Sequence, residues 1–145
     1  MKSFEVFEGE LFTDQRGIIT SVNDLSFEGM KRFYVIKHDR KSIVRGWNAH
    51  QYEKQWLYCV KGGFKLGLVE VDNWERPSKD VKPEIIQLQE NKSRMVYVPE
   101  GVATCLQATT DEAQLLVFSD KTYNECLEDR FRFDVDYWGD WKEMK

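Results

Sequence analysis

The chain has 145 residues, with 21 basic and 25 acidic side chains and a formal net charge of −4. This length suits one domain, and 41% hydrophobic with 14% aromatic residues is too apolar a composition for a disordered chain. The acidic balance and the scattered Lys and Arg argue against nucleic acid and membrane surfaces as partners, because both require a basic patch.

The termini, cysteines and histidines narrow the classes of protein that remain possible. No apolar run approaches the roughly 18 residues that span a bilayer, and the charged N-terminus is unlike a signal peptide, so we expect a cytoplasmic protein. Cys59, Cys105 and Cys126 form no CxxC pair, which predicts reduced thiols. With only His38 and His50 in the chain, a multi-histidine metal site cannot form, and we expect no metal or other cofactor.

Short segments that alternate in hydrophobicity or are rich in β-branched and aromatic residues recur along the chain, which is typical of an all-β sandwich or barrel. Glycines in Lys61-Gly62-Gly63 predict a hairpin turn between two of them, and the polar, proline-containing segment Asp72–Pro83 predicts a long loop. The expected strands are Gly17–Val22, Arg32–Lys37, Ser42–Trp47, Gln55–Val60, Phe64–Val71, Glu84–Leu88, Arg94–Val98, Ala103–Ala108 and Ala113–Ser119.

No composition shift or repeat divides the chain, so residues 1–145 are expected to form one domain. The segment from about 125 to 145 is rich in aromatic residues, and we expect it to pack back on the barrel or on a partner subunit.

Four motifs give the chain a resemblance to one superfamily. They are Phe12–Gly17, Arg45–His50, Val98–Ala103, and Leu115–Ser119 followed by Tyr123. In this order they resemble the double-stranded β-helix (cupin, jelly-roll) enzymes that act on dTDP-linked 4-keto-6-deoxy sugars. These enzymes include the dTDP-4-dehydrorhamnose 3,5-epimerases and the dTDP-4-keto-6-deoxyglucose 3,4-ketoisomerases. The resemblance implies an all-β, single-domain cupin barrel.

Three features favour the ketoisomerase branch. The chain lacks the longer tails of the epimerases. Met30–Tyr34 resembles the ketoisomerase pattern Ile-Lys-Arg-x-Tyr, and Asn48-Ala49-His50 resembles the ketoisomerase His-Ala-His. We therefore prefer 3,4-ketoisomerisation over 3- or 3,5-epimerisation, both of which move protons through an enol intermediate.

The resemblance also implies residues that bind the nucleotide. Arg45 and Arg16 match arginines that contact the diphosphate, whose oxygens suit the planar guanidinium fork. The alternative for Arg16 is an ion pair with Asp14, and for Arg45 a surface ion pair. Phe12 matches an aromatic residue that stacks on thymine from the neighbouring subunit, with core packing as its alternative.

His50 and Tyr34 are the catalytic candidates. Histidine takes and gives protons near neutral pH, and a tyrosine can serve as the acid. The alternatives are a structural histidine and a tyrosine at the rim of a strand. Asn48 occupies the position of the first family histidine, which is the base in the epimerases, and asparagine cannot exchange protons. Asn48 and His50 should face the same side of a strand.

Further departures from the epimerase pattern occur at residues that the resemblance implies for substrate binding. Thr104 replaces a histidine, and Phe118 occupies the position of a tyrosine acid. Gln55 replaces a lysine, although a shift of one residue would bring Lys54 to that place. Tyr123 lies near a second aromatic position of the epimerases.

These observations leave several hypotheses. The preferred one is an isomerase of a nucleotide-linked sugar, acting as a homodimer in deoxysugar or cell-surface polysaccharide biosynthesis. A catalytically silent cupin that binds a sugar nucleotide is the main alternative, favoured by Asn48, Thr104 and Phe118. A cupin acting on another small molecule is a third, and a metal-dependent oxygenase is disfavoured by the lack of ligands. We expect an N-terminal strand to be added across subunits.

Overall fold

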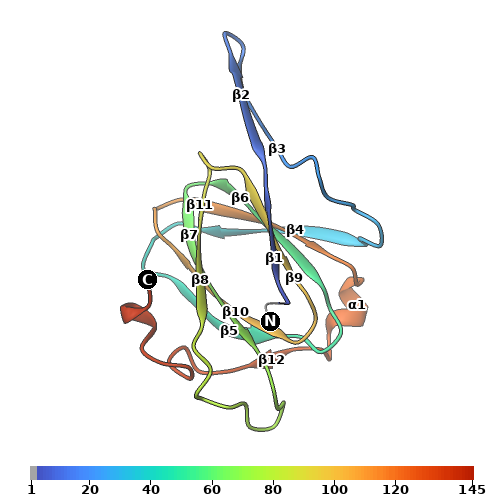
Figure 1. Cartoon of the computed structure of the whole chain (residues 1–145), viewed down its shortest axis with the longest axis vertical. Helices are drawn as coiled ribbons and strands as arrows, with labels where there is room; N and C mark the ends of the chain where they lie inside the picture. Colours follow the sequence, from blue (N-terminus) through green and yellow to red (C-terminus); the bar gives the residue numbers. More distant parts are fainter. Residues whose placement is uncertain (1–2) are drawn as a thin grey trace.

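The computed structural model describes residues 3–145 and consists almost entirely of antiparallel strands (Figure 1). A short helix, α1 (Tyr123–Cys126), and a 3-10 helix, η1 (Trp141–Glu143), lie near the C-terminus. Neither has the length or the apolar character that a membrane-crossing helix needs, and no other helix occurs within residues 3–145. The strands are β1 (Glu5–Glu8), β2 (Glu10–Asp14), β3 (Gly17–Ser21), β4 (Arg32–His38), β5 (Val44–Ala49), β6 (Gln55–Lys61), β7 (Gly63–Glu70), β8 (Glu84–Gln89), β9 (Arg94–Val98), β10 (Val102–Ala108), β11 (Ala113–Ser119) and β12 (Phe131–Arg132).

Two five-stranded sheets face each other, with strand orders β1-β9-β6-β11-β4 and β12-β5-β10-β7-β8. Between β4 and β7, and again between β8 and β12, each successive strand crosses to the opposite sheet. This alternation makes the two sheets the halves of a jelly-roll barrel, closed around a common interior (Figure 1). The prediction of an all-β cupin fold is confirmed.

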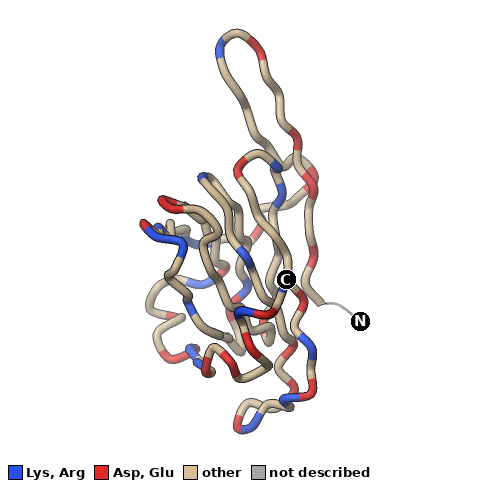
Figure 2. Tube along the Cα trace, turned by 90° about the vertical axis from the view of Figure 1, so that its left-hand side faces the viewer, with Lys and Arg blue, Asp and Glu red and all other residues tan. Residues whose placement is uncertain are grey.

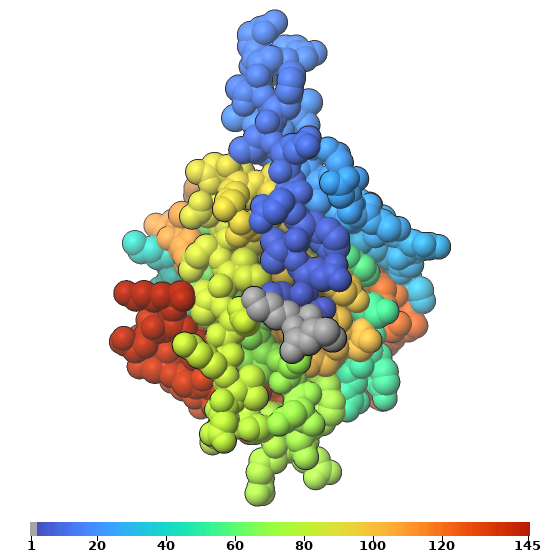
Figure 3. Space-filling model, viewed as in Figure 1, coloured from blue at the N-terminus to red at the C-terminus, as the bar shows by residue number. Residues whose placement is uncertain are grey.

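The hairpin of β2 and β3 forms a separate two-stranded sheet that projects from the barrel (Figures 1 and 3). Its apolar side chains are solvent-exposed, among them Ile18 and Ile19 at 67% and 63% of their surface. Acidic and basic residues are scattered over the rest of the trace, as Figure 2 shows.

Strand β11 shows how the sequence pattern builds the barrel. Its residues alternate between buried and half-buried positions, so Leu115, Val117 and Ser119 face inward. Leu57 of the neighbouring strand β6 and Leu66 of β7, in the other sheet, are buried in the same core cluster. Burial of these alternating apolar side chains is the main force that holds the sheets together.

A second apolar cluster lies where the C-terminal segment meets β5, β7 and β10. Trp47 of β5 packs edge-on against Trp138 and Trp141, which are 5% and 2% exposed. Gly67 of β7 is required there, because a Cβ atom would lie 2.8 Å from each of the Trp47 and Trp141 rings. Lys65 adds a hydrogen bond of 2.6 Å from Nζ to the carbonyl oxygen of Trp141. The last residues of the chain are thereby fixed to this sheet.

All nine predicted strands are present, with ends that differ by at most two residues, and residues 72–83 form the predicted loop. The predicted hairpin at Lys61-Gly62-Gly63 is wrong, because β6 and β7 lie in different sheets and do not pair. Gly62 has φ of +70°, which suits any abrupt change of direction, and here the chain passes from one sheet to the other. The glycine pattern identified the turn but not the partner strands.

Strands β1, β2 and β12 were not among the predicted elements. β12 is only two residues long, and β1 is rich in charged residues. β1 pairs with β9 of its own chain, with Glu5 opposite Tyr97 and Glu8 opposite Arg94. β1 therefore covers a sheet edge of its own chain.

Candidate active site

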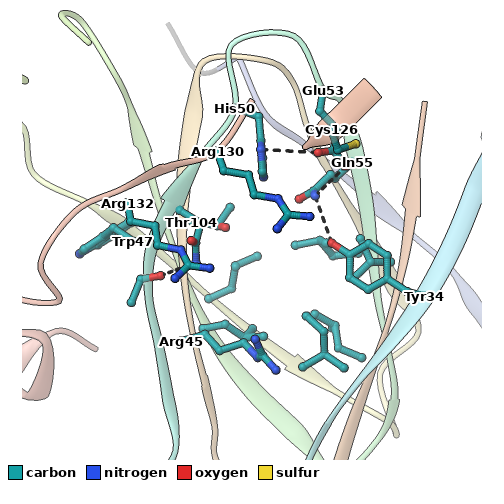
Figure 4. Close-up of a pocket in the computed structure, with 18 of the residues that line it drawn as sticks. Tyr34, Arg45, Trp47, His50, Glu53, Gln55, Thr104, Cys126, Arg130 and Arg132 are labelled. Atoms are coloured by element: carbon teal, nitrogen blue, oxygen red, sulfur yellow. Dashed lines mark hydrogen bonds and ion pairs between the residues drawn. The ribbon is translucent and has the colours of Figure 1, made fainter. Parts of the chain in front are cut away.

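A cavity of about 810 Å³ opens between the two sheets. Strands β4, β5, β6, β10 and β11 contribute to its wall, and the segment from Tyr123 to Phe133 borders it on the C-terminal side (Figure 4). Most of the site residues expected from the sequence line it. They are Tyr34, Arg45, Asn48, His50, Gln55, Thr104 and Tyr123.

Arg16 and Phe12 do not reach this cavity, because both lie on the projecting hairpin of β2 and β3. Phe12 is 58% exposed. Arg16 Nη2 lies 2.5 Å from Oδ2 of Asp14, the ion pair considered as the alternative from the sequence.

The structure also resolves the choice between Lys54 and Gln55. Gln55 is buried and lines the cavity, whereas Lys54 extends away from it, with Nζ 4.0 Å from the Glu100 carboxylate. Gln55 Nε2 donates to Tyr34 Oη at 3.2 Å and to Glu53 Oε2 at 3.1 Å. Gln55 therefore links a catalytic candidate to a buried carboxylate.

His50 follows the last residue of β5, and its imidazole borders the cavity. Its Nδ1 lies 2.5 Å from the carbonyl oxygen of Asp129. Because a carbonyl can only accept a hydrogen bond, Nδ1 must carry the proton, and in the neutral ring Nε2 holds the lone pair. No side chain or backbone group in residues 3–145 hydrogen-bonds to Nε2. His50 is therefore arranged to accept a proton at Nε2.

Glu53 lies three residues beyond His50, and its side chain is almost fully buried. Oε1 is 3.5 Å from His50 Nδ1, Oε2 is 3.6 Å from Arg32 Nη2, and Ser119 Oγ donates to Oε2 at 2.7 Å. Burial raises the pKa of Glu53, but the hydrogen bond from Ser119 and the neighbouring His50 outweigh burial and bring the pKa below its ordinary value. Glu53 is thus held as a carboxylate beside the imidazole.

Tyr34 projects into the cavity from β4 (Figure 4). Burial, together with the negative charge of Glu53, raises the pKa of Tyr34 to about 12. The Arg32 guanidinium lies 4.9 Å from the centre of the Tyr34 ring. The phenol therefore keeps its proton at neutral pH and can act only as a proton donor in a first step.

The charged side chains that line the cavity are five basic residues and one acidic residue, Glu53. Lys37, Arg45, Arg130 and Arg132 line it without an ion pair to any carboxylate within residues 3–145. Figure 4 shows the guanidinium groups of Arg130 and Arg132 projecting into the cavity opposite Tyr34. In a chain with a net charge of −4, this local excess of positive charge points to an anionic ligand.

Arg45 is held by a buried histidine. Its Nε donates to His38 Nε2 at 3.1 Å, and His38 is only 2% exposed. Burial and the positive charge of Arg45 lower the pKa of His38, so the ring stays neutral and can accept this hydrogen bond. The hydrogen bond to His38 orients the Arg45 side chain along the cavity wall.

Asn48 and Thr104 lie opposite each other on β5 and β10, and both line the cavity. Asn48 Nδ2 donates to the carbonyl oxygen of Gly46 at 2.8 Å. Phe118 does not line the cavity, because alternation along β11 turns it outward against Phe27, with ring centres 5.2 Å apart. Phe118, which occupies the position where the resemblance expects a tyrosine acid, therefore does not face the cavity.

Sequence reasoning missed Glu53, Arg130, Arg132 and Asp129 as site residues. Glu53 had one available signal, its spacing of three residues from His50. The other three lie in the aromatic C-terminal segment, far along the chain from the motifs. Their position at the cavity depends on the pairing of β12 with β5, which no local pattern predicted.

Comparisons with solved structures place this fold among nucleotide-sugar enzymes. The 3,4-ketoisomerase QdtA from Thermoanaerobacterium thermosaccharolyticum, solved as a histidine-to-asparagine mutant in complex with TDP-4-keto-6-deoxyglucose, has 26% identity and a TM-score of 0.72. That match covers 95% of this chain and 93% of QdtA. It supports an isomerase-type reaction in general terms, without specifying which one.

More distant structures share the fold. The WlaRB TDP-quinovose 3,4-ketoisomerase from Campylobacter jejuni has 20% identity and a TM-score of 0.71, covering 95% of this chain and 98% of that one. The RmlC epimerase from Mycobacterium tuberculosis has 17% identity and a TM-score of 0.75, covering 95% and 74%.

A search of curated protein sequences finds no match. A family model described as "FdtA: WxcM-like, C-terminal" matches residues 2–137, which is nearly the whole chain. The chain therefore belongs to the WxcM-like, C-terminal (FdtA) family.

Proposed function

We propose that this protein is an isomerase of nucleotide-linked 4-keto-6-deoxy sugars, with a dTDP sugar as substrate and 3,4-ketoisomerisation as the reaction. One observation carries the proposal. A single cavity combines His50, with an unpartnered Nε2, the protonated phenol of Tyr34, and unpaired basic side chains. Proton transfer on an anionic substrate requires these three components.

The basic residues supply the binding site for the diphosphate. Arg45, Arg130 and Arg132 can each offer two parallel N–H donors to phosphate oxygens, and Lys37 adds a point charge. With the diphosphate on this side, the sugar would extend toward His50 and Tyr34. The TDP-4-keto-6-deoxyglucose in the QdtA structure supports this substrate class.

The chemistry follows from the positions of the protons. His50 Nε2 removes the proton on C3, next to the C4 ketone, while Tyr34 Oη donates its proton to the ketone oxygen and an enediol forms. Glu53 stabilises the imidazolium that results, because a nearby negative charge favours the protonated ring. His50 then returns its proton to C4, and the tyrosinate recovers a proton from the C3 hydroxyl. The ketone has moved to C3, and each side chain is restored.

Epimerisation at C3, or at C3 and C5, uses the same first step and is a less favoured version of this proposal. Asn48 favours a different function, a cupin that binds a sugar nucleotide without turning it over. Its amide cannot exchange protons, and Nδ2 is already engaged with Gly46 O. Under that alternative, His50 and Tyr34 are structural groups.

We also propose that the enzyme is a homodimer that works in the cytoplasm in deoxysugar or cell-surface polysaccharide biosynthesis. Exposed apolar side chains support a dimer, among them Phe12 and Ile18 on the hairpin and Phe33 on β4. A dimer would also offer Arg16 and Phe12 a cavity to reach.

A direct test is to incubate the protein with dTDP-4-keto-6-deoxyglucose and follow the 3-keto product by carbon NMR. We expect turnover by the unmodified protein and a loss of at least about 100-fold in His50→Asn, since a general base contributes about 10² to 10⁴ in rate. Turnover that survives in His50→Asn would contradict the role of His50. Binding of dTDP without any product would support the silent binder.

A further inference from the structure

The loop between β5 and β6 carries both His50 and Glu53, and a single residue far along the chain holds it. The Asp129 carboxylate accepts three successive backbone N–H groups: Gln51 N at 2.6 Å to Oδ1, and Tyr52 N and Glu53 N at 2.9 and 3.1 Å to Oδ2. The carbonyl oxygen of the same residue accepts the proton of His50 Nδ1. Asp129 therefore contacts every residue of the loop from 50 to 53.

Asp129 is itself firmly placed. It is only 6% exposed, and its backbone N–H donates to Cys126 O at 3.1 Å, at the end of α1. On its other side, Phe131 and Arg132 form β12, which pairs with β5 directly before His50. A buried carboxylate with three N–H donors is a stable arrangement, because these donors replace most of the hydrogen bonds to water that the carboxylate loses.

We propose that Asp129 is the positioning residue of this site, so that the C-terminal segment completes the proton-transfer machinery. The carboxylate fixes the course of the loop, and the loop in turn aims His50 Nδ1 at the Asp129 carbonyl. This contact selects the tautomer in which Nε2 holds the lone pair. The same segment carries Arg130 and Arg132, so one stretch of chain positions the base and also supplies anion-binding side chains.

The catalytic consequence rests on the proposed function, but the positioning of His50 does not. The Asp129→Asn variant keeps the size of the side chain and the backbone carbonyl, while it removes the charge and turns an NH₂ group toward the backbone N–H donors. Asp120→Asn is the matched control. Asp120 Oδ1 accepts the next backbone N–H along, that of Lys54 at 2.8 Å, and does not contact His50.

The first measurement is the imidazole tautomer of His50 by long-range proton–nitrogen NMR, at a pH well above the ordinary histidine pKa of about 6.5. The chain has only two histidines, so His38→Gln assigns the spectrum. We expect a protonated Nδ1 in the unmodified protein and in Asp120→Asn, and a mixture of tautomers in Asp129→Asn. A protonated Nε2 in the unmodified protein, or an unchanged tautomer in Asp129→Asn, would overturn the proposal.

The second measurement is turnover. A displaced base lowers kcat by about 10- to 100-fold, and we expect this in Asp129→Asn with dTDP affinity within about twofold of the unmodified protein. A fall in kcat no larger than that of Asp120→Asn would contradict the catalytic role. If the unmodified protein shows no turnover, the proposed function fails, and the tautomer alone decides whether Asp129 positions His50.

A third measurement covers the case in which Asp129→Asn does not fold. Hydrogen exchange of the Gln51, Tyr52 and Glu53 amides in the unmodified protein reports directly on their bonds to Asp129. Slow exchange at these three amides supports the proposal that Asp129 holds the loop. Exchange as fast as in an open loop would overturn it.

Discussion

His50 Nδ1 lies 3.5 Å from Oε1 of Glu53, three residues later in the chain. The turn between β5 and β6 brings the two side chains together at the inner end of the cavity (Figure 4). Glu53 is buried, and its pKa lies below the ordinary value, so it faces the imidazole as a charged carboxylate. A proton accepted by His50 is therefore stabilised at once by an adjacent negative charge.

Replacing Glu53 by Gln tests this pairing. We expect kcat to fall by about 10- to 100-fold, because the positive charge that develops on His50 during proton transfer loses the buried carboxylate beside it. The affinity for dTDP should change little, since Glu53 lies at the sugar end. Glu100→Gln, which alters an exposed carboxylate beside Lys54, is the control. An unchanged kcat in Glu53→Gln would show that the carboxylate has no part in proton transfer.

Tyr34→Phe removes the proposed acid and keeps the ring. The loss of a general acid predicts a fall in kcat of about 10² to 10⁴ with KM nearly constant. Tyr52→Phe is the control, since Tyr52 is 67% exposed. Steady-state kinetics of the two variants should differ sharply, and equal rates would mean that another group protonates the ketone oxygen.

Arg132→Gln should weaken dTDP binding. The Arg132 side chain projects into the cavity without a carboxylate partner in the described chain, so its charge is free for phosphate oxygens. We expect the Kd for dTDP to rise by about 10- to 100-fold by calorimetry, the value of one or two charge-assisted hydrogen bonds. Arg40→Gln, an exposed arginine paired with Asp39, should leave Kd unchanged. Equal affinities in both variants would place the anion site elsewhere.

The buried His38, which accepts a hydrogen bond from Arg45, predicts a pH dependence of stability. Burial and Arg45 lower the pKa of His38, so as pH falls below about 6.5 the unfolded chain takes up a proton that the folded one refuses. The free energy of unfolding should fall over this range, down to the folded pKa. In His38→Gln this contribution should be absent. Urea denaturation between pH 5 and 8 compares the two, and identical slopes would contradict a neutral buried His38.

The barrel strands could be predicted from local patterns, whereas the complete site could not. Alternation in Ala113–Ser119 and β-branched runs such as Ile85–Ile86 are set by which face meets the core, and short windows contain that information. The turn at Gly62 was visible, but its strand partners depend on contacts across the whole barrel.

The residues of the cavity likewise fall into those that sequence motifs could predict and those that they could not. Residues supplied by motifs, such as Arg45 and His50, line the same cavity. Asp129 and Arg132 were missed because their positions arise from the pairing of β5 with a segment about 80 residues later, which only the folded chain displays. Phe118 faces away from the cavity, against Phe27, so its identity says nothing about an acid in the cavity.

The proposed reaction requires this cavity to move a proton on C3 of a nucleotide-linked 4-keto sugar. The most direct measurement is proton NMR of the protein with dTDP-4-keto-6-deoxyglucose in deuterated water. We expect loss of the C3 proton signal alone, together with new signals of a 3-keto sugar. Loss of both the C3 and C5 signals would mean epimerisation, and full retention of both over hours with dTDP bound would contradict the claim.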